Sequence, residues 1–319
     1  MNAYFDISNL RSLAKSGGHQ DFKSCTDMLR HNYNLCFNFS KDLLAKEKKQ
    51  AQQSIMNLLK LLTRNRGNSE SIIWNHSFPP RPLTAELYSS LTNEQLTSLY
   101  FLEDGNINAM KQHGCLIFAI EGDEIKALSN LSIEGEYLPT KKYHIRKMCN
   151  WKVIEDNVCP CTDIIIIDPY IFSQSDILYE YNSYKIIEHL SKNNNYEVDV
   201  VIFTLKDNPF STIERQLKER IGEKLKLTFV IIPEGKLKEH DRTIITNYKM
   251  FDSGDSFTYF DDRGNNLSHG RWLHVNSHGN REIRELSLQY LRDLQLLIDD
   301  RKGGLNSIIG DKKSNFLKF

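Results

Sequence analysis

The sequence lacks the features that would hold a protein in a membrane or draw it as a whole to a polyanion. Its 319 residues include 41 basic and 41 acidic side chains, so the formal net charge at pH 7 is zero. No overall positive field therefore attracts nucleic acid or anionic lipid. The apolar runs, such as residues 115–120, 164–167 and 229–232, are far shorter than the about 18 residues of a membrane-spanning helix. A nucleic acid or a membrane would have to bind a local patch of the protein surface.

Cysteine is also scarce, with six residues spread along the chain without regular spacing. Such spacing is typical of reduced thiols in a cytosol rather than of a disulfide framework. The first residues include Asp6 and Arg11, where a secretion signal would have a basic end and then an apolar stretch. We therefore expect a soluble, cytoplasmic protein with no transmembrane segment.

The common signatures of nucleotide-binding proteins and serine hydrolases are missing as well. The sequence contains no glycine-rich phosphate loop, no dinucleotide fingerprint and no Gly-x-Ser-x-Gly elbow. His144 and the cysteines at 149, 159 and 161 do not suit zinc, because ligands two residues apart rarely fit a tetrahedral ion. The basic cluster at 141–147, beside Trp151, would either meet a nucleic-acid backbone or form a solvated segment between domains.

Apolar strands alternate with amphipathic helices, and this alternation predicts an α/β fold. A chain of this length favours two domains of about 150 residues each, and an irregular stretch with Gly135, Pro139 and Pro160 separates them. In the second half, the alternation favours a largely parallel sheet. We predict a first domain at 1–135, a linker at 136–162, a second domain at 163–301 and a flexible tail at 302–319.

Acidic residues stand beside the predicted strands of the first half. Asp6 ends the apolar strand that opens the chain. The strand at 34–39 leads into the longest predicted helix, at 41–64, which Ser40 can cap and whose first turn holds Asp42. Two more acids flank the strand at 114–119. The four candidate site residues are Asp6, Asp42, Asp104 and Asp123.

The order of these acids resembles a nuclease domain of the PIN type. The opening Phe5-Asp6-Ile-Ser8-Asn9-Leu10 is similar to the first strand of that family, with its metal-binding aspartate and following serine. The resemblance implies that the four acids converge on Mg²⁺ or Mn²⁺, held by Asp6, Asp104 and Asp123, and that the ion activates water at a phosphodiester. In the other interpretation, the acids cap helices or lie in solvated loops. Glu103 and Glu121 are alternatives to Asp104 and Asp123 in the metal site.

The second half carries a different resemblance. The strand at 163–171, which contains Asp168-Pro-Tyr-Ile, and the His240-Asp241-Arg242 segment that opens a hairpin resemble the C-terminal domain of MIT-domain proteins. The resemblance implies a phospholipase-D-like fold. Catalysis of that type needs a His-x-Lys-x4-Asp motif, in which imidazole attacks phosphorus while lysine neutralises the phosphoryl oxygens. Arg242 stands in the place of that lysine, so the resemblance implies a binding module.

Three interpretations of this second site stay open. In the first, Asp241 orients His240 while Arg242 pairs with a carboxylate such as Asp168 in an internal polar network. In the second, the same four residues bind a ligand, with His240 and Arg242 on a phosphate or a nucleotide end. The third is a catalytic role.

Our leading hypothesis is an intracellular effector, such as a toxin or an anti-phage defence protein. In it, a metal-dependent nuclease domain that acts on RNA or DNA is joined to a sensing or docking domain. The alternative is a non-enzymatic adaptor that binds a partner protein, a nucleic acid or a membrane. Asp6 discriminates between them, because an acid at the end of an apolar strand demands a partner, which a cation or a helix N-terminus supplies.

Overall fold

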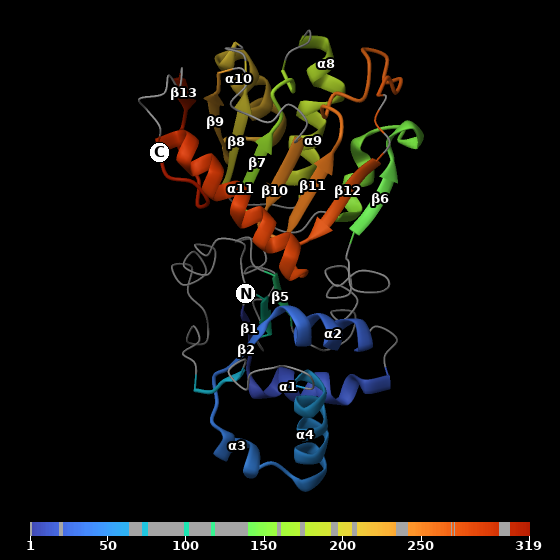
Figure 1. The fold of residues 1–319 in the computed structure, drawn as a ribbon, viewed down its shortest axis with the longest axis vertical. Helices are drawn as coiled ribbons and strands as arrows, with labels where there is room; N and C mark the ends of the chain where they lie inside the picture. The colour runs from blue at the N-terminus through green and yellow to red at the C-terminus, as the bar shows by residue number, and fades with distance from the viewer. Residues whose placement is uncertain are drawn as a thin grey trace. The chain divides into compact units, whose positions relative to one another are not determined.

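The computed structural model describes residues 2–18, 22–63, 72–75, 99–101, 116–118, 140–157, 161–172, 176–192, 197–205, 209–233, 242–268, 270, 272–299 and 307–319. The chain divides into two compact units, one formed by Met1–Pro139 with Gly279–Arg281 and the other by Thr140–His278 with Glu282–Phe319 (Figure 1). Each unit combines helices with a β-sheet, which confirms the predicted α/β class. No helix in these ranges has both the length and the apolar character needed to cross a membrane.

The first unit holds a five-stranded sheet in the order β3-β2-β1-β4-β5, and every neighbouring pair is parallel. The central strand, β1, places Phe5 beside Phe37 of β2 and Phe101 of β4. These side chains are buried, and the Phe5 and Phe101 rings stack with centroids 4.1 Å apart, as is typical of parallel strands with two covered faces. The strands are β1 (Asn2–Phe5), β2 (Asn34–Phe37), β3 (Ile72–Ile73), β4 (Leu99–Phe101) and β5 (Leu116–Phe118).

The prediction of one continuous helix at 41–64 is wrong, because this segment forms two helices. The backbone N–H groups of residues 46 and 47 donate to carbonyls three residues earlier. This tight turn ends α3 (Lys41–Ala45), and α4 (Lys49–Thr63) begins afresh. Ser40 caps α3 as predicted, and α4 buries the apolar face predicted for it. The other helices described in this unit are α1 (Ile7–Lys15) and α2 (Phe22–Asn32).

The second unit holds an eight-stranded sheet in the order β13-β9-β8-β7-β10-β11-β12-β6. Only β7, β8 and β9 are parallel, so the predicted largely parallel sheet is correct for these three strands alone. The remaining pairs are antiparallel, because the chain after β9 returns as a run of antiparallel strands. The strands are β6 (Thr140–His144), β7 (Asp163–Ile167), β8 (Val198–Thr204), β9 (Leu225–Ile231), β10 (Arg242–Thr246), β11 (Lys249–Ser253), β12 (Trp272–Ser277) and β13 (Ser307–Gly310).

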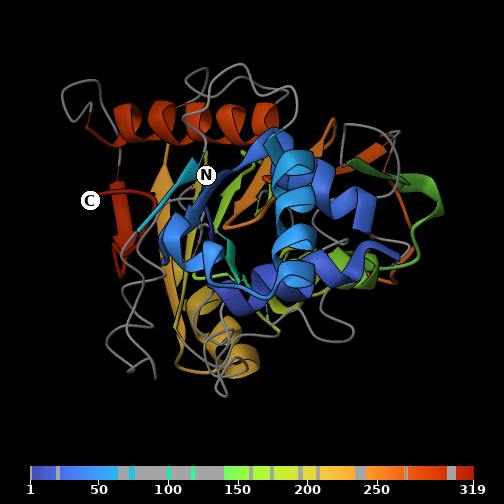
Figure 2. The same ribbon diagram turned by 90° about the horizontal axis from the view of Figure 1, so that it is seen from below.

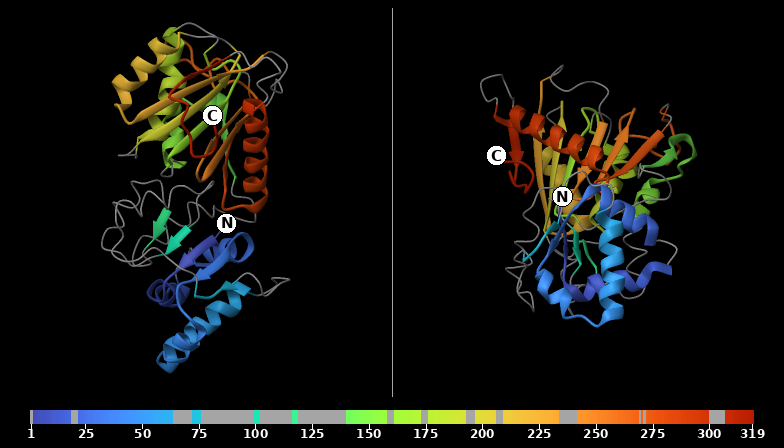
Figure 3. Two further views of the ribbon diagram at one scale, coloured as in Figure 1. Left: turned by 90° about the vertical axis from the view of Figure 1, so that its left-hand side faces the viewer. Right: turned by 60° about the horizontal axis from the view of Figure 1, so that its bottom comes forward.

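Helices lie on both faces of this second sheet (Figures 2 and 3). On one face, α8 (Asp176–Tyr181), α9 (Ser183–Ser191) and α10 (Phe210–Ile221) cover the main apolar core. On the other face runs α11 (Arg281–Asp299), which buries Leu291, Leu294 and Ile298. The hollow described below is lined by residues of this helix and of β10, β11 and β12.

Residues 140–157 differ from the predicted linker, because they belong to the second unit. β6 pairs with β12 at the edge of the sheet, and two short 3-10 helices follow at Ile145–Lys147 and Trp151–Asn157. Trp151 is buried and stacks on Tyr259 with ring centroids 4.6 Å apart, while its Nε1 donates to Asn182 Oδ1. Burial of a large aromatic ring outweighs the irregular, mixed-charge sequence around it.

The predicted flexible tail is likewise ordered from residue 307 onward. β13 pairs with β9, and the Asp163 carboxylate accepts hydrogen bonds from Ser314 Oγ at 2.6 Å and from the Asn315 N–H at 2.7 Å. Phe316 and Leu317 are buried. The sequence does not indicate these contacts, because the residues around Ser314 are polar and their partner Asp163 lies far away in the chain.

Candidate functional site

Asp6 is the predicted site residue that the structure places most clearly. It directly follows the central strand β1, between the ends of β2 and β4. Its N–H donates to the Phe101 carbonyl at the end of β4, and the Asn38 N–H donates to the Phe5 carbonyl. The strand order changes direction at β1 and β4, and the crevice beyond the carboxyl ends of strands at such a point is where open α/β sheets bind ligands.

The Asp6 carboxylate is buried, with the residue 8% exposed, and it caps α1. Its Oδ1 accepts from the Asn9 N–H at 2.7 Å and from Asn9 Nδ2 at 3.0 Å. A negative charge at a helix N-terminus is favourable, because the first N–H groups of a helix have no partners within it. The helix N-terminus is therefore one of the two kinds of partner predicted for this acid.

The remaining acids of the first unit are placed less fully. Asp42 lies in the first turn of α3 and is exposed. Asp104 and Asp123 lie outside the described residues, although in sequence they follow β4 and β5, whose ends share the edge of the sheet with the end of β1. Within the described ranges, no group of three or more His, Cys, Asp or Glu side chains is placed to hold a metal ion.

In the second unit, Asp168 is a buried anchor for the loop after β11. Its carboxylate accepts from the Tyr170 N–H at 3.0 Å, and from Ser256 Oγ and the Phe257 N–H, each at 2.8 Å. Burial raises the pKa of Asp168 to about 6, although the three hydrogen bonds and the charge of Arg242 favour the carboxylate. Asp168 therefore holds the fold together at the edge of the sheet where β10 begins.

Arg242 opens β10 at this same edge, while His240 and Asp241 lie outside the described residues. The Arg242 guanidinium carbon is 5.7 Å from the centre of the Tyr170 ring, which is a cation–π contact. Its Nε is buried and has no hydrogen-bond partner within the described part of the chain. The Asp168 oxygens accept instead from the three groups named above, so the predicted Asp168–Arg242 pairing is absent as a hydrogen bond between these two described residues.

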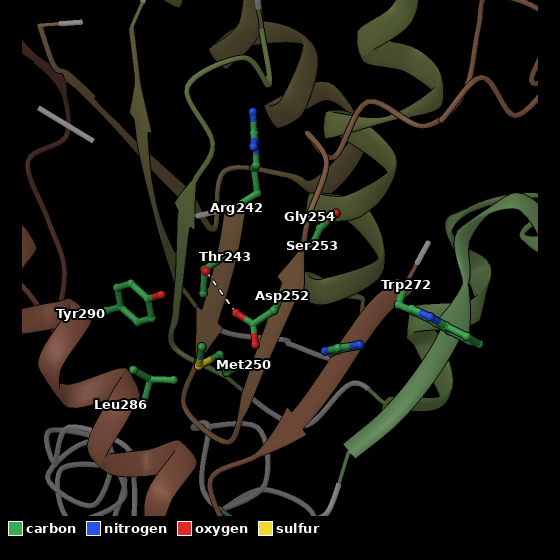
Figure 4. A pocket seen from close by; sticks show the side chains of 10 residues that line it. Arg242, Thr243, Met250, Asp252, Ser253, Gly254, Trp272, Leu286 and Tyr290 are labelled. Carbon is green, nitrogen blue, oxygen red and sulfur yellow. Dashed lines mark hydrogen bonds between the residues drawn. The ribbon is translucent and has the colours of Figure 1, made fainter. Parts of the chain in front are cut away.

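A hollow of about 450 Å³ lies on the face of the second sheet beside α11 (Figure 4). Its floor includes Thr243 on β10 and Asp252 on β11, joined by a hydrogen bond of 3.1 Å. Leu286 and Tyr290 of α11 form one wall. Arg242 stands at the rim, and its side chain extends beyond the end of the strand in Figure 4. Among these residues, only Arg242 is a candidate predicted from the sequence.

The polar floor is set by strand register. Thr243 pairs with Asp252, Asp252 with His274 and His274 with Lys142, so four residues form a row across β10, β11, β12 and β6. Asn276 Nδ2 also donates to Asp252, at 2.7 Å. Burial, and then the charge of Lys142, lowers the pKa of His274, which favours its neutral imidazole. The alternation of side chains along each strand indicates which residues share this face. Only the register between the strands shows that these four residues lie in one row.

The other histidines and cysteines in the described part of the second unit do not form a metal-binding group. His278 is buried between the Asn247 carbonyl and Ser287 Oγ, and burial lowers its pKa to about 3. Cys161 is buried and directs Sγ at the Leu190 carbonyl, whereas Cys149 is exposed. His269 and Cys159 lie outside the described residues.

Comparisons with known proteins do not assign a family. No family model matches the chain, and no curated protein matches it. Among solved structures, it is similar to TrmBL2, an archaeal chromatin protein described with a novel mode of DNA binding, at 14% identity and a TM-score of 0.28. The match covers 56% of this chain and 59% of that chain, which is less than two thirds of its length. A TM-score this low does not establish a shared fold.

A second buried acid lies near the opposite end of β7 and β8. Asp199 is 4% exposed, and its Oδ1 has no hydrogen-bond partner within the described part of the chain. Burial, with the charges of Asp163 and Asp311, raises its pKa to about 7, against the charge of Lys226. The folded state therefore binds a proton here that the unfolded chain releases near pH 4.

Asp199→Asn is accordingly expected to stabilise the protein more as the pH rises. We expect its gain in free energy of unfolding, measured by urea denaturation, to be about 2 kcal/mol larger at pH 8 than at pH 5, because the wild type must ionise a buried carboxyl beside the charges of Asp163 and Asp311 in that window. The lowered pKa of His278 makes its contribution to stability increase with pH, in the variant and in the wild type alike. The free energies of unfolding of the two proteins are therefore compared with each other at each pH. Asp262→Asn, at an exposed acid, should show no such trend, and a pH-independent gain for Asp199→Asn would refute the assignment.

Proposed function

We propose that the first unit is a divalent-metal-dependent nuclease similar to PIN domains, acting on RNA or DNA. The observation that carries the proposal is the position of Asp6, a buried carboxylate at the carboxyl end of the central strand of a parallel sheet. That edge is also where the chain leaves β2, β4 and β5. The proposal is that Asp42, Asp104 and Asp123, which follow these strands in sequence, join Asp6 there.

The donor set fits a hard divalent cation. Mg²⁺ and Mn²⁺ prefer oxygen ligands, and Mg²⁺ usually takes one or two carboxylates and keeps several waters. Asp6, Asp104 and Asp123 would hold the ion, which when bound would lower the pKa of a coordinated water and polarise the phosphodiester. Asn9 fixes the orientation of the Asp6 carboxylate through two hydrogen bonds, so the acid would be preorganised for its ligand.

The second unit would then be a non-catalytic sensing or docking domain of the phospholipase-D-like kind. Supporting this, Arg242 stands where the catalytic motif needs lysine, and the Asp168 carboxylate is committed to three hydrogen bonds within the fold. The competing function is a non-enzymatic adaptor. It is favoured by one observation, that the Asp6 carboxylate already has a structural task as the cap of α1.

Removal of the metal tests the proposal. The purified full-length chain, incubated with labelled single-stranded RNA or DNA and Mn²⁺ or Mg²⁺, should cleave at least one of these substrates, and excess EDTA should stop the reaction because the ion supplies the activated water. Restoring Mn²⁺ should restore cleavage. Cleavage that continues in EDTA would refute the metal-dependent mechanism, and the absence of cleavage with either metal and either substrate would support the adaptor instead.

A further inference from the structure

Exposed cations lie along the edge strand β6 of the second unit and in the turn that follows it. Lys142 on β6, and Arg146 and Lys147 in the 3-10 helix that comes next, are exposed. Within the described part of the chain, none of the three has an ion-pair partner. Their charges therefore create a local positive field, although the chain as a whole carries no net charge.

Strand register places these cations beside an aromatic side chain. In the antiparallel pair of β6 and β12, Lys142 lies opposite His274, and His144 lies opposite Trp272. Side chains at alternate positions of a strand share one face of the sheet, so Lys142 and Trp272 are diagonal neighbours on the same face, with Cα atoms about 7–8 Å apart. Lys142 and Arg146 stand two residues to either side of His144, so positive charge flanks the aromatic ring in both directions along the strand.

Trp272 presents much of its indole ring to solvent, since the residue is 42% exposed. In Figure 4 its side chain extends toward β6, where the His144 ring contacts it with centroids 5.1 Å apart and an interplanar angle of 63°. This contact orients the indole while the rest of the ring stays accessible. Trp151, the aromatic residue that the sequence places beside the basic cluster, is buried against Tyr259 and cannot stack on a ligand.

An accessible ring between cations favours a single nucleic-acid strand as the occupant of this surface. Proteins bind single strands by stacking bases on aromatic side chains beside a positively charged track for the backbone. An acidic peptide would use the charges alone, and a duplex keeps its bases inside the stack. Asp252, the acid in the row that contains Lys142, lies two strands away on β11, about 10 Å from Lys142. It therefore leaves the cations on β6 available to phosphates.

We propose that the β6–β12 edge of the second unit binds single-stranded nucleic acid. One base stacks on Trp272, and the phosphates on either side of it lie at Lys142 and at the Arg146–Lys147 turn. This inference goes beyond the proposed nuclease activity, because it concerns the second unit and needs neither a metal ion nor the acids of the first unit. It gives the proposed docking domain a ligand class.

Fluorescence anisotropy with the full-length chain in EDTA tests the inference, since EDTA silences any metal chemistry of the first unit. The probes are labelled oligothymidylate, labelled oligouridylate and a thymidylate strand in which abasic sites replace the bases. The wild type should bind at least one of the two intact strands, with a slope of log affinity against log salt of about −2 for three neutralised phosphates. The abasic strand should bind at least fivefold more weakly, because it has no base to stack.

Variants separate the ring from the charges. Trp272→Ala should weaken binding of the intact strand at least fivefold and leave binding of the abasic strand unchanged, whereas Trp272→Phe should stay within about threefold of the wild type, since a smaller ring still stacks. Lys142→Ala should reduce the steepness of the salt slope by about 0.7. Arg215→Ala, which removes the same charge from the exposed surface of α10, should bind as the wild type does, and all variants should keep the wild-type thermal melt.

Three results would overturn the inference, whatever the nuclease assay shows. These are no binding of either intact strand in EDTA, equal binding of the intact and abasic strands by the wild type, and binding of a polyglutamate peptide of equal charge as tight as that of the strands. The abasic comparison needs no variant, so it decides even where Trp272→Ala fails to fold. A chain that binds the strands through Trp272 but cleaves neither would refute the proposed nuclease alone.

Discussion

Asp6→Asn is expected to slow metal-dependent cleavage by roughly a hundredfold to a thousandfold, the usual cost of removing one preorganised electrostatic group from an active site. The substitution removes the charge that would bind the ion and changes little else. Asparagine caps helices as well as aspartate does, and its Oδ1 can still accept from the Asn9 N–H that Asp6 binds at 2.7 Å. Initial rates on single-stranded RNA and DNA with Mn²⁺ measure the effect.

Asp27→Asn is the matched control for this experiment. Asp27 is a partly exposed acid of α2 in the same unit, paired with Arg30 at 2.8 Å, so the variant makes the same change of charge away from the strand ends. Its rate should equal that of the wild type, and both variants should keep the wild-type thermal melt. An Asp6→Asn protein that cleaves at the wild-type rate would remove Asp6 from the proposed mechanism.

Deletion of residues 307–319 is expected to unfold the second unit. The deletion removes β13 from the sheet edge and exposes the apolar surfaces covered by Phe316 and Leu317, each worth about 1.5–3 kcal/mol of burial. It also leaves the fully buried Asp163 carboxylate without Ser314 and Asn315, and a buried charge that loses its partners costs about 3–5 kcal/mol. Together these losses rival the about 5–15 kcal/mol that stabilises a typical domain. Urea unfolding measures the result.

Single substitutions test the contribution of this segment one side chain at a time. Phe316→Ala should lower the free energy of unfolding by about 3–5 kcal/mol, as expected for a buried phenylalanine. Lys318→Ala, at an exposed neighbouring side chain, should change it by less than about 0.5 kcal/mol. A dispensable tail, with the deleted protein unfolding at the wild-type urea concentration, would show that these contacts contribute little.

Local patterns in the sequence predicted the elements that local interactions create. The apolar run before Asp6 predicted β1, and Ser40 before an apolar periodic stretch predicted the start of α3. These features depend on residues a few positions apart. The turn that divides α3 from α4 had no such mark, because lysines and glutamate occur equally well inside a helix.

The hollow and the ordered tail depend on contacts between residues far apart in the chain, which is why the sequence did not reveal them. Thr243, Asp252 and His274 share a row only once three strands are in register, and a shift by one residue would turn each strand over. In the same way, Ser314 and Asn315 have a polar, solvated pattern until Asp163 is placed beside them.

Calorimetric titration of Mn²⁺ into the full-length chain, with no nucleic acid present, tests most directly the central claim that the strand ends around Asp6 hold a metal ion. The account predicts saturable binding to the wild type, the same affinity for Asp27→Asn and at least a tenfold weaker affinity for Asp6→Asn, because the ion loses a charged oxygen ligand. Saturable binding with equal affinity in the wild type and Asp6→Asn, or no binding to the wild type, would contradict it.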